Sequence, residues 1–459
     1  MSQPTSPWRG FAFISVAIFI ASLDLFIVNI AFPAIGEDFP EASVSGLSWI
    51  LSAYAIVFAA LLVPFGKLGD LVGRLRVFRA GLAVFTLGSA LCALAPSAEL
   101  LVAARVVQAA GAAALTPTSL GLVLPRFPAE RRSAVIGAWA ALGGVGAAMG
   151  PPLGGLLVEL SWHWIFVINV PLGLLCLAFV GRYFTEIRDP SGRLPDGIGA
   201  VLAVACVGLL ALGLAQGPDW GWDGRVLGCL AGAVVTGAML VARSRRHLEP
   251  VLALDLLRSP TFSLASLATF VFFAGFAGLL LVVSLFLQLG LHFTPVHAGL
   301  TFIPLSLGVA ITAGASYALM PRFGRKVLQG GLLLVAAALG WLAITVTHHG
   351  LGVSSWQLVP ALLAFGLGMG FVFGPLFNVI LAGVEDHEVG SASGTLNAIQ
   401  QLGNSIGVAV LATIFFSLLD HGHLPPSAMT ATALISAGLF VASFGLSFRL
   451  PKDARMEEI

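Results

Sequence analysis

Charged residues are scarce in this sequence. Only 10% of its 459 residues are Asp, Glu, Lys or Arg, whereas 58% are hydrophobic. A soluble domain carries about a quarter charged residues, so this chain has too few charges to cover the surface of a soluble protein of its size. Its net charge of +1 also argues against the basic surface that nucleic-acid binding requires. We therefore expect no soluble domain and no nucleic-acid partner.

Signatures of enzymes and cofactor sites are also missing. The chain has no P-loop, no GxGxxG after a strand, no HExxH and no GxSxG, which argues against ATP hydrolysis and against an enzyme. Its four cysteines lie in apolar runs without CxxC spacing, so we expect them to serve in packing. The acidic cluster Glu385–Glu388 is interpreted as a solvated loop. We predict no enzymatic activity, no cofactor and no metal.

Long hydrophobic runs fill most of the chain instead. A run of about 18 residues, as a helix, is long enough to cross a bilayer core of about 30 Å. In lipid the backbone must satisfy its own hydrogen bonds, so these runs predict α-helices. The sequence therefore predicts an all-α integral membrane protein with fourteen transmembrane spans. The expected spans are 11–33, 47–66, 77–95, 100–123, 133–157, 164–183, 197–216, 226–242, 260–287, 297–319, 327–347, 357–383, 391–418 and 428–449.

Basic residues fall on one side of the membrane in this assignment. Every lysine and arginine except Arg105 and Arg225 lies in a segment on the same side as the N-terminus. Basic loops are typically cytoplasmic, and an even number of spans returns the chain to the side where it began. We predict a multi-pass protein with both termini in the cytoplasm. The first apolar run is expected to remain as a span because no cleavable signal peptide precedes it.

Two polar cytoplasmic linkers divide the spans. They are Glu186–Asp196 and Arg243–Ser259, and they separate one helix pair from two groups of six spans. A weak repeat supports this division, because Gly-Arg followed by a cation occurs after the second span of each group. We predict three parts, in which the middle pair packs at the periphery. They are an N-terminal six-helix bundle (1–188), an additional helix pair with its linkers (189–258) and a C-terminal six-helix bundle with a cytoplasmic tail (259–459).

Two charged residues lie inside predicted spans. Asp24 is the only carboxylate well inside a span, and Arg105 is the only cation there. Each charge costs several kcal/mol at the bilayer centre unless it is paired or hydrated, so both are candidate functional residues. One hypothesis is a static ion pair that holds two spans together. The other is a proton carrier, in which Asp24 faces a partly wet cavity and Arg105 acts on its protonation.

Two glycine-containing segments have unusual spacing. After the second span comes Gly66-x-x-x-Asp70-x-x-Gly73-Arg74-x-Arg76, where glycine allows a tight turn and the charges can form ion pairs. In the fifth span, glycines four residues apart share one helix face, which lets a neighbouring backbone approach closely. Two prolines then bend this helix. The residues of this second segment are Gly146, Gly150, Pro151, Pro152, Gly154 and Gly155.

These motifs resemble those of the major facilitator superfamily, and in particular its fourteen-span drug:proton antiporter family. The span ending Asn29-Ile-Ala-Phe-Pro33, the Arg105-x-x-Gln108 pattern and the segment from Trp162 to Gly173 carry the closer resemblance. Ala109 departs from the family's usual glycine, which puts local helix packing in doubt. The resemblance implies the major facilitator fold, two six-helix bundles plus two additional helices, around a central cavity. It also implies a conformational latch at Asp70 and Arg74 and a pliable gate in the fifth span.

Polar amides within the spans are candidates for substrate binding. An amide in a span either hydrogen-bonds a neighbouring helix or lines a cavity, and both interpretations stay open here. The candidates are Asn29, Gln108, Asn378, Gln400 and Asn404, and Gln401 is a further amide in a predicted span.

The resemblance and the single carboxylate together predict the function. We expect proton-coupled efflux of lipophilic drugs or toxic compounds across the plasma (inner) membrane, by alternating access, in a bacterial cell. The expected partners are a small lipophilic substrate, protons and membrane lipids, and the protein is expected to act as a monomer. One alternative is an exporter of a single endogenous lipid, peptide or metabolite. Another is a membrane sensor or lipid-binding protein that does not transport.

Overall fold

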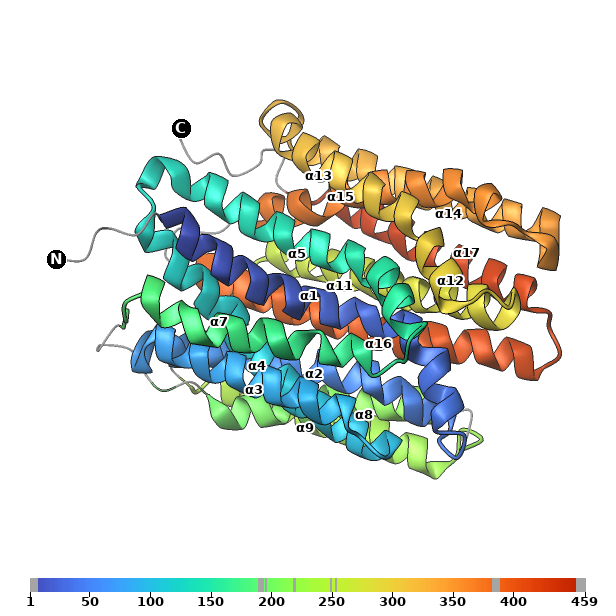
Figure 1. Cartoon of the computed structure of the whole chain (residues 1–459), viewed down its shortest axis with the longest axis horizontal. Helices are drawn as coiled ribbons and strands as arrows, with labels where there is room; N and C mark the ends of the chain where they lie inside the picture. Colours follow the sequence, from blue (N-terminus) through green and yellow to red (C-terminus); the bar gives the residue numbers. More distant parts are fainter. Residues whose placement is uncertain are drawn as a thin grey trace.

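Helices are the only regular structure in the described residues. The long helices run side by side, and α1 begins at the same end of the molecule at which α17 ends (Figure 1). The opposite end is called the outer end below, since the positive-inside rule predicts that it faces away from the cytoplasm. The predicted linker positions 189–193 and 195 and the acidic cluster 385–388 lie outside the described residues. The computed structural model describes residues 7–188, 194, 196–217, 220–247, 250–251, 254–381 and 389–450.

The first seven α-helices form the N-terminal bundle. Helix α3 packs along α4, α1 along α5 and α2 along α4, and α7 closes the bundle against α1 and α3. Serine caps begin two of these helices: Ser43 accepts a hydrogen bond from the Gly46 N–H, and Ser97 accepts one from the Leu100 N–H. The helices are α1 (Pro7–Asp38), α2 (Val44–Val72), α3 (Arg74–Ala93), α4 (Ala98–Val123), α5 (Ala129–Val158), α6 (Trp164–Val167) and α7 (Asn169–Tyr183).

The C-terminal bundle repeats these pairings. Helix α14 packs along α15, α11 along α16 and α13 along α15, and α17 closes the bundle against α11 and α14. The repeat extends to the links, because single glycines with positive φ, Gly73 (130°) and Gly324 (50°), join α2 to α3 and α13 to α14. The helices are α11 (Pro260–Leu285), α12 (Pro295–Thr301), α13 (Ile303–Phe323), α14 (Arg325–His349), α15 (Ser355–Leu381), α16 (Val389–Asp420) and α17 (Pro425–Ser447).

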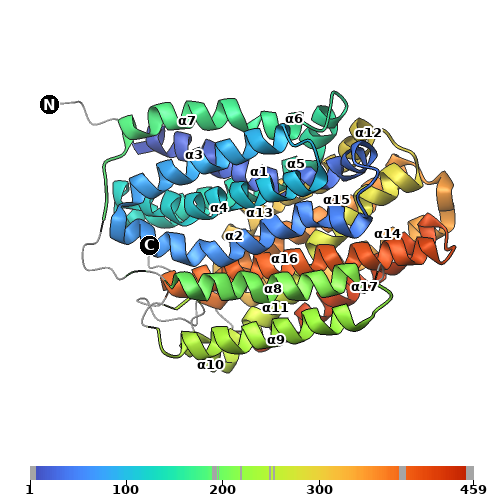
Figure 2. The same cartoon turned by 90° about the horizontal axis from the view of Figure 1, so that it is seen from below.

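One helix of the additional pair, α8 (Gly197–Gln216), lies against both bundles. It packs along α9 (Gly224–Ser244), and it also contacts α2 of one bundle and α16 of the other. Figure 2 shows α8 between α16 and α9. At the outer end, the Ser45 hydroxyl of α2 donates a hydrogen bond of 3.1 Å to the Gln216 side chain. The expectation of a peripheral pair therefore holds for α9, whereas α8 covers the seam where the two bundles meet.

The structure supports the predicted fourteen spans, with two of them interrupted. Thirteen helical segments among the described residues are long and apolar enough to cross a membrane. Helix α5, with 30 residues, completes the set, although its described apolar part covers only Val145–Val158. The spans expected at 164–183 and 297–319 each begin with a short helix, α6 and α12. Proline explains both breaks, since Pro171 and Pro304 lack the N–H that would continue the preceding helix.

Candidate functional site

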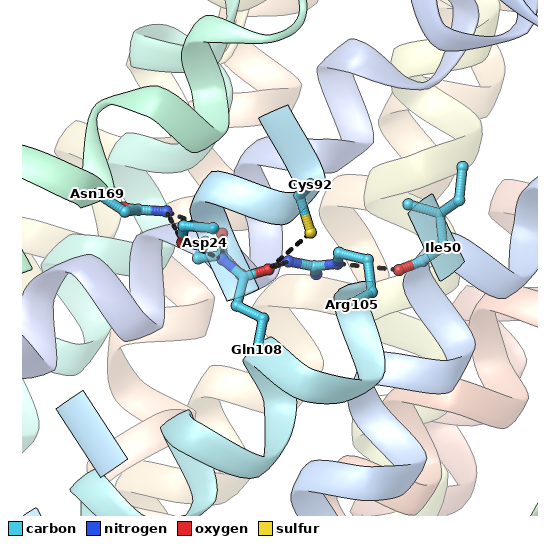
Figure 3. A network of polar contacts seen from close by, with 7 residues as sticks. Asp24, Ile50, Cys92, Arg105, Gln108 and Asn169 are labelled. Atoms are coloured by element: carbon cyan, nitrogen blue, oxygen red, sulfur yellow. Dashed lines mark hydrogen bonds and ion pairs between the residues drawn. The ribbon is translucent and has the colours of Figure 1, made fainter. Parts of the chain in front are cut away.

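A buried ion pair joins α1 to α4. Asp24 and Arg105 have no exposed surface, and the Arg105 Nη1 group is bonded to Asp24 Oδ2 (Figure 3). The Arg105 Nε–H donates to the Ile50 carbonyl of α2 at 3.1 Å. The guanidinium also lies 4.0 Å from the centre of the Tyr54 ring, where a cation–π interaction is favourable. The two charges that the sequence placed in separate spans therefore contact each other directly.

Two side-chain amides complete the surroundings of Asp24. Gln108 lies one turn after Arg105 and accepts a hydrogen bond from Arg105 Nη1 at 2.6 Å. Its Nε2 group donates to Asp24 Oδ1 at 2.8 Å and to the Ser89 hydroxyl at 2.6 Å. Asn169 Nδ2 also donates to Asp24 Oδ1, at 3.1 Å. The carboxylate thus receives hydrogen bonds from α4 and α7, each within the range of normal geometry or shorter.

This network lies inside the N-terminal bundle. Asp24 is bonded to α4 and α7, and the other members come from α2 and α3. The carboxylate is 0% exposed, so the expectation that Asp24 faces a partly wet cavity does not match the structure. The physical reason is that the donors from α4 and α7 turn the carboxylate into its own bundle. Asn169 and Ser89 were not among the predicted site residues. Asn169 lies in the segment from Trp162 to Gly173 that carries the family resemblance, but no role was assigned to it there, and Ser89 is a small polar residue in an apolar run without distinctive spacing.

The loop after α2 is held by an ion pair and a carbonyl. Arg74 Nε lies 2.7 Å from Asp70 Oδ1, one helical turn earlier, and Arg74 Nη1 donates to the Gly121 carbonyl of α4 at 2.8 Å. Gly66 packs against α4, because a Cβ atom there would lie 3.2 Å from Pro117 Cβ. These partners of Asp70 and Arg74 all belong to the N-terminal bundle. The loop therefore joins α2, α3 and α4 to one another.

Glu186, which follows α7, caps α3. Its carboxylate oxygens accept hydrogen bonds from the backbone N–H groups of Leu75 (2.9 Å) and Arg76 (3.2 Å), and Arg76 Nε lies 3.6 Å from Glu186 Oε2. A carboxylate at a helix N-terminus satisfies unpaired N–H groups and favours the helix dipole. Glycine is favoured at position 73 because its φ is 130°, and a Cβ atom there would also lie 2.4 Å from the Glu186 carboxyl carbon. Sequence reasoning missed this role because the contact joins segments more than a hundred residues apart.

Helix α5 packs its glycine face tightly on α1. A Cβ atom at Gly146, Gly150 or Gly154 would come within 3.0 Å of atoms of α1. Gly155 faces the other way, where a Cβ atom would lie 2.4 Å from the Pro295 carbonyl oxygen of the C-terminal bundle. Pro151 also lies in this contact, because its carbonyl oxygen is 2.7 Å from the Cβ position of Gly299. Helix α5 is thus in close contact with its own bundle on one face and with the other bundle on the next.

Serine side chains of the C-terminal bundle bond to carbonyls beside prolines in the N-terminal bundle. Pro33 has no N–H, so the Asn29 carbonyl four residues earlier has no helical partner. The Ser284 hydroxyl of α11 donates to this carbonyl at 3.0 Å. Pro152 leaves the Ala148 carbonyl unpaired in the same way, and the Ser306 hydroxyl of α13 donates to it at 2.5 Å. The helix pairs α1–α11 and α5–α13 are therefore joined by the same kind of hydrogen bond, from a serine hydroxyl to a carbonyl four residues before a proline.

Gln288 adds a third hydrogen bond between the bundles. It lies in a π-helical turn, Phe286–Gly290, that ends α11, and its Nε2 group donates to the Ile30 carbonyl at 3.0 Å. The same group lies 3.0 Å from the Ser284 hydroxyl. Such turns often position functional side chains. Asn29, Ile30 and Gln288 are toward the outer ends of their helices, so these bonds hold that part of the seam closed.

The remaining predicted amides lie apart from the Asp24 network. Asn378 of α15 and Gln400 of α16 are half-buried. Asn404 is buried, and its Nδ2 group donates to the Gln401 side chain at 2.5 Å. The Asn29 side chain is buried as well, and its backbone carbonyl makes the contact described above. Of the predicted substrate-binding amides, the structure brings only Gln108 to the charged pair.

The described residues contain no group of three His, Cys, Asp or Glu side chains arranged to hold a metal ion.

Repeated six-helix bundles with a charged pair enclosed in one of them define a multi-pass membrane protein of the transporter class. The chain belongs to the Major Facilitator Superfamily, whose sequence profile matches residues 14–408. Members of this superfamily carry small molecules, so the protein is a transporter and not an enzyme. The expected superfamily and fold are thereby confirmed.

Several relatives share about a third of the sequence. The probable actinorhodin transporter of Streptomyces coelicolor is 37% identical over 422 residues, which cover 90% of this chain and 73% of the relative. The methylenomycin A resistance protein of the same organism is 32% identical and covers 93% and 89%. The multidrug resistance protein Stp of Mycobacterium tuberculosis is 36% identical and covers 88% and 75%.

Solved structures share the fold at low sequence identity. The E. coli xylose transporter XylE, in a partially occluded inward-open conformation, superposes with a TM-score of 0.65 at 13% identity, covering 96% of this chain and 98% of the other. The human organic anion transporter MFSD10 gives a TM-score of 0.64 at 18% identity, with 97% and 100% covered. These likenesses support the fold alone.

Proposed function

We propose that the protein exports lipophilic drugs or toxic compounds across the bacterial plasma membrane in exchange for protons. The observation that carries this proposal is Asp24, a fully buried carboxylate bonded to Arg105 inside the N-terminal bundle. The resistance and export functions in the names of its relatives support the direction of transport and the kind of substrate. A single titratable carboxylate is sufficient to carry a proton, so no further ion site is required.

Protonation of Asp24 changes the balance of charge in its bundle. With the carboxylate ionised, the pair with Arg105 is neutral overall and is held by the amides of Gln108 and Asn169. A proton on Asp24 leaves Arg105 as an uncompensated charge, and an unpaired charge is costly in a low-dielectric interior. The helices that carry the pair, α1 and α4, are then biased toward an arrangement with better hydration of Arg105. Proton binding from outside and substrate binding from inside alternate in this scheme.

The rest of the machinery follows the same scheme. The halves 1–188 and 259–459 rock about the seam, and the part 189–258 covers it through α8. Asp70 and Arg74, with Gly66, Gly73 and Arg76, act as a latch that holds α2, α3 and α4 together in this state. The gate is the α5 segment, whose close contacts with α1 and α12 limit leakage at the outer end. Both termini are cytoplasmic, and the monomer is the functional unit in contact with membrane lipids.

A second candidate is an exporter of one endogenous metabolite. The relatives include a probable actinorhodin transporter and a tetracenomycin C resistance and export protein, each named for a single compound. Asn29, Asn378, Gln400 and Asn404 are then candidates for contacts with that compound. A narrow substrate range separates this candidate from the first.

Uptake into inside-out vesicles, in which the cytoplasmic side faces the medium, tests the proposal. The wild type is expected to accumulate a fluorescent lipophilic cation only when a proton gradient is imposed, and Asp24→Asn is expected to abolish this uptake. Asp223→Asn is the matched control, because Asp223 is an exposed carboxylate bonded to Arg225 at the start of α9. Unchanged gradient-driven uptake by Asp24→Asn would refute the role of Asp24. A correctly inserted wild type that moves no broad dye would favour the second candidate.

A further inference from the structure

Asn169 is held in a fixed position at the start of α7. It is the first residue of that helix, directly after the break that separates α6 from α7, and its side chain is only 1% exposed. One turn later α7 packs tightly on α3, since a Cβ atom at Gly173 would lie 2.1 Å from the Thr86 hydroxyl. The amide points at Asp24 (Figure 3). Asn169 therefore connects the sixth span to the carboxylate.

One end of the Asn169 amide is used and the other is not. Its Nδ2 group donates to Asp24 Oδ1 at 3.1 Å and to the Ser89 hydroxyl at 3.3 Å. Its Oδ1 atom is buried and has no hydrogen-bond partner among the described residues. Buried amide oxygens are rarely left without a donor, and each such atom needs an explanation. One explanation is that Asn169 Oδ1 accepts a hydrogen bond only when the neighbouring Asp24 is protonated.

The other acceptors beside Asp24 are already in use. Gln108 Oε1 accepts from Arg105 Nη1, and the Ser89 hydroxyl accepts from both amides. The Tyr54 hydroxyl is also unpartnered, but no hydrogen bond of its side chain to Asp24 is described, and its ring lies against the guanidinium of Arg105. Asn169 Oδ1 is thus the unoccupied acceptor on a side chain that already touches Asp24 Oδ1.

We propose that Asn169 is a positioning residue that responds to the proton on Asp24. The inference rests on the proposed function, because it assumes that Asp24 takes up a proton. With the carboxylate ionised, Nδ2 faces Asp24 and Oδ1 has no donor. When a proton from water binds Asp24 Oδ1, the side-chain amide of Asn169 turns over, and its Oδ1 accepts a hydrogen bond from the new O–H group. Both protonation states then find a matching partner in one side chain.

Among the side chains around Asp24, Asn169 is better placed than the others to respond to a proton on the carboxylate. The titratable groups that face it are Arg105 from α4, Tyr54 from α2 and Cys92 from α3. Helix α5 packs along α1 but has its charged residues only in its first turn. Gln108 is bonded at both ends of its amide, so turning it over would break the bond to Arg105. Because α7 begins at Asn169, the turn also changes how the sixth span is attached to α1.

Infrared difference spectroscopy of the reconstituted protein tests this inference. In the difference spectrum between low and high pH, protonation of Asp24 is expected to give a carboxyl C=O band, and this band should be absent in Asp24→Asn. In Asn169→Leu, which keeps the approximate volume and removes the acceptor, the band is expected to shift to higher frequency. Asn169→Gln, which retains an amide, is expected to shift it less. Asn404→Leu is the matched control, because it removes a buried amide of α16 outside the network, and it should leave the band in place.

Transport gives a second readout that packing alone would not change. Asn169→Leu is expected to reduce gradient-driven efflux about tenfold, as for loss of a hydrogen bond to a charged group, while its pH profile flattens and downhill flux without a gradient persists. Asn169→Ala is the second variant if the leucine protein fails to accumulate. An Asp24 band that stays in place in both variants would overturn the role of Asn169 alone. A wild type without any Asp24-dependent band would overturn protonation of Asp24 and this inference with it.

Discussion

At the scale of single residues, the free-energy cost of burying two charges in this transporter depends on a few side chains. Asp24 and Arg105 are both withdrawn from solvent, and the interior is tolerable for them only because each charge faces the other. The Ile50 carbonyl accepts a further proton of Arg105, and the Gln108 and Asn169 amides donate to lone pairs of Asp24. The pair is therefore strongly coupled, and the effect of removing one member depends on whether the other is present.

A double-mutant cycle measures that coupling. Asp24→Asn and Arg105→Gln are each expected to lower the free energy of unfolding by about 3–5 kcal/mol, because each leaves one buried charge without its partner. The double variant has no net charge to bury and should lose less than the sum. Thermal denaturation in detergent, followed by tryptophan fluorescence, gives the comparison. Additive losses would mean that the two side chains do not interact in the folded protein.

The sequence singled out both buried charges, but it left open whether they contact each other and gave no indication of their surroundings. Asp24 and Arg105 stood out because an ionised group in an apolar run is expensive, whatever the fold. The bond of Asn169 to Asp24 and that of Ser89 to Gln108 depend on how α7 and α3 pack in the folded protein. Residue spacing along the sequence does not predict that packing. Gln108 was named as a candidate for substrate binding, with a hydrogen bond to a neighbouring helix as the open alternative, and the structure places it between Arg105, Asp24 and Ser89.

At the scale of helices, apolar length predicted the spans and proline explained their exceptions. Helices α6 and α12 were expected as the beginnings of longer helices, because hydropathy does not register a missing N–H. The link between α2 and α3 was predicted as a tight glycine turn, and Gly73 has the positive φ that only glycine adopts readily. The Glu186 carboxylate that caps α3 could not be predicted, since four helices, α4 to α7, separate it from α3 in the sequence.

Loss of the Glu186 carboxylate should loosen the first turn of α3. In Glu186→Gln the Leu75 and Arg76 N–H groups lose a charged acceptor, which costs about 0.5–2 kcal/mol at a helix N-terminus. Hydrogen–deuterium exchange of the peptide that covers this turn should become faster, while exchange in α4 stays unchanged. Glu159→Gln, at an exposed position after α5, is the control. Equal exchange in Glu186→Gln and wild type would contradict the cap.

For the molecule as a whole, the seam between the bundles is what has to open and close. The described hydrogen bonds across it come from Ser284, Gln288, Ser306 and Ser405. The first three end on carbonyls near Pro33 and Pro152, and the Ser405 hydroxyl of α16 donates to the Ser52 carbonyl of α2 at 3.4 Å. A carbonyl without a helical partner gains more from an outside donor than one already bonded within its helix. Helix α8 contacts both bundles, so any rocking motion must also slide along α8. The closed outer end thus depends on a few neutral hydrogen bonds, which can be exchanged for water at modest cost.

Removal of the serine donors should shift the protein toward an outward-open state. Ser284→Ala and Ser306→Ala together remove two hydrogen bonds worth about 1–3 kcal/mol in total, which changes the ratio of closed to open molecules about 5- to 150-fold. Spin labels at Leu160→Cys and Trp356→Cys, two exposed outer-end positions on opposite bundles, with the native cysteines replaced, should report a growing population at longer distance.

The matched control for this experiment is Ser443→Ala. Ser443 donates to the Ala268 carbonyl at 3.2 Å within the C-terminal bundle, so its loss weakens the protein without touching the seam. The label distances should then stay as in wild type. If Ser443→Ala lengthens them equally, the opening reflects general loosening of the fold. If the double serine variant leaves them unchanged, the Gln288 hydrogen bond to the Ile30 carbonyl and the close glycine contacts of α5 with α12 hold the outer end closed, and the two serine hydrogen bonds contribute nothing to the gate.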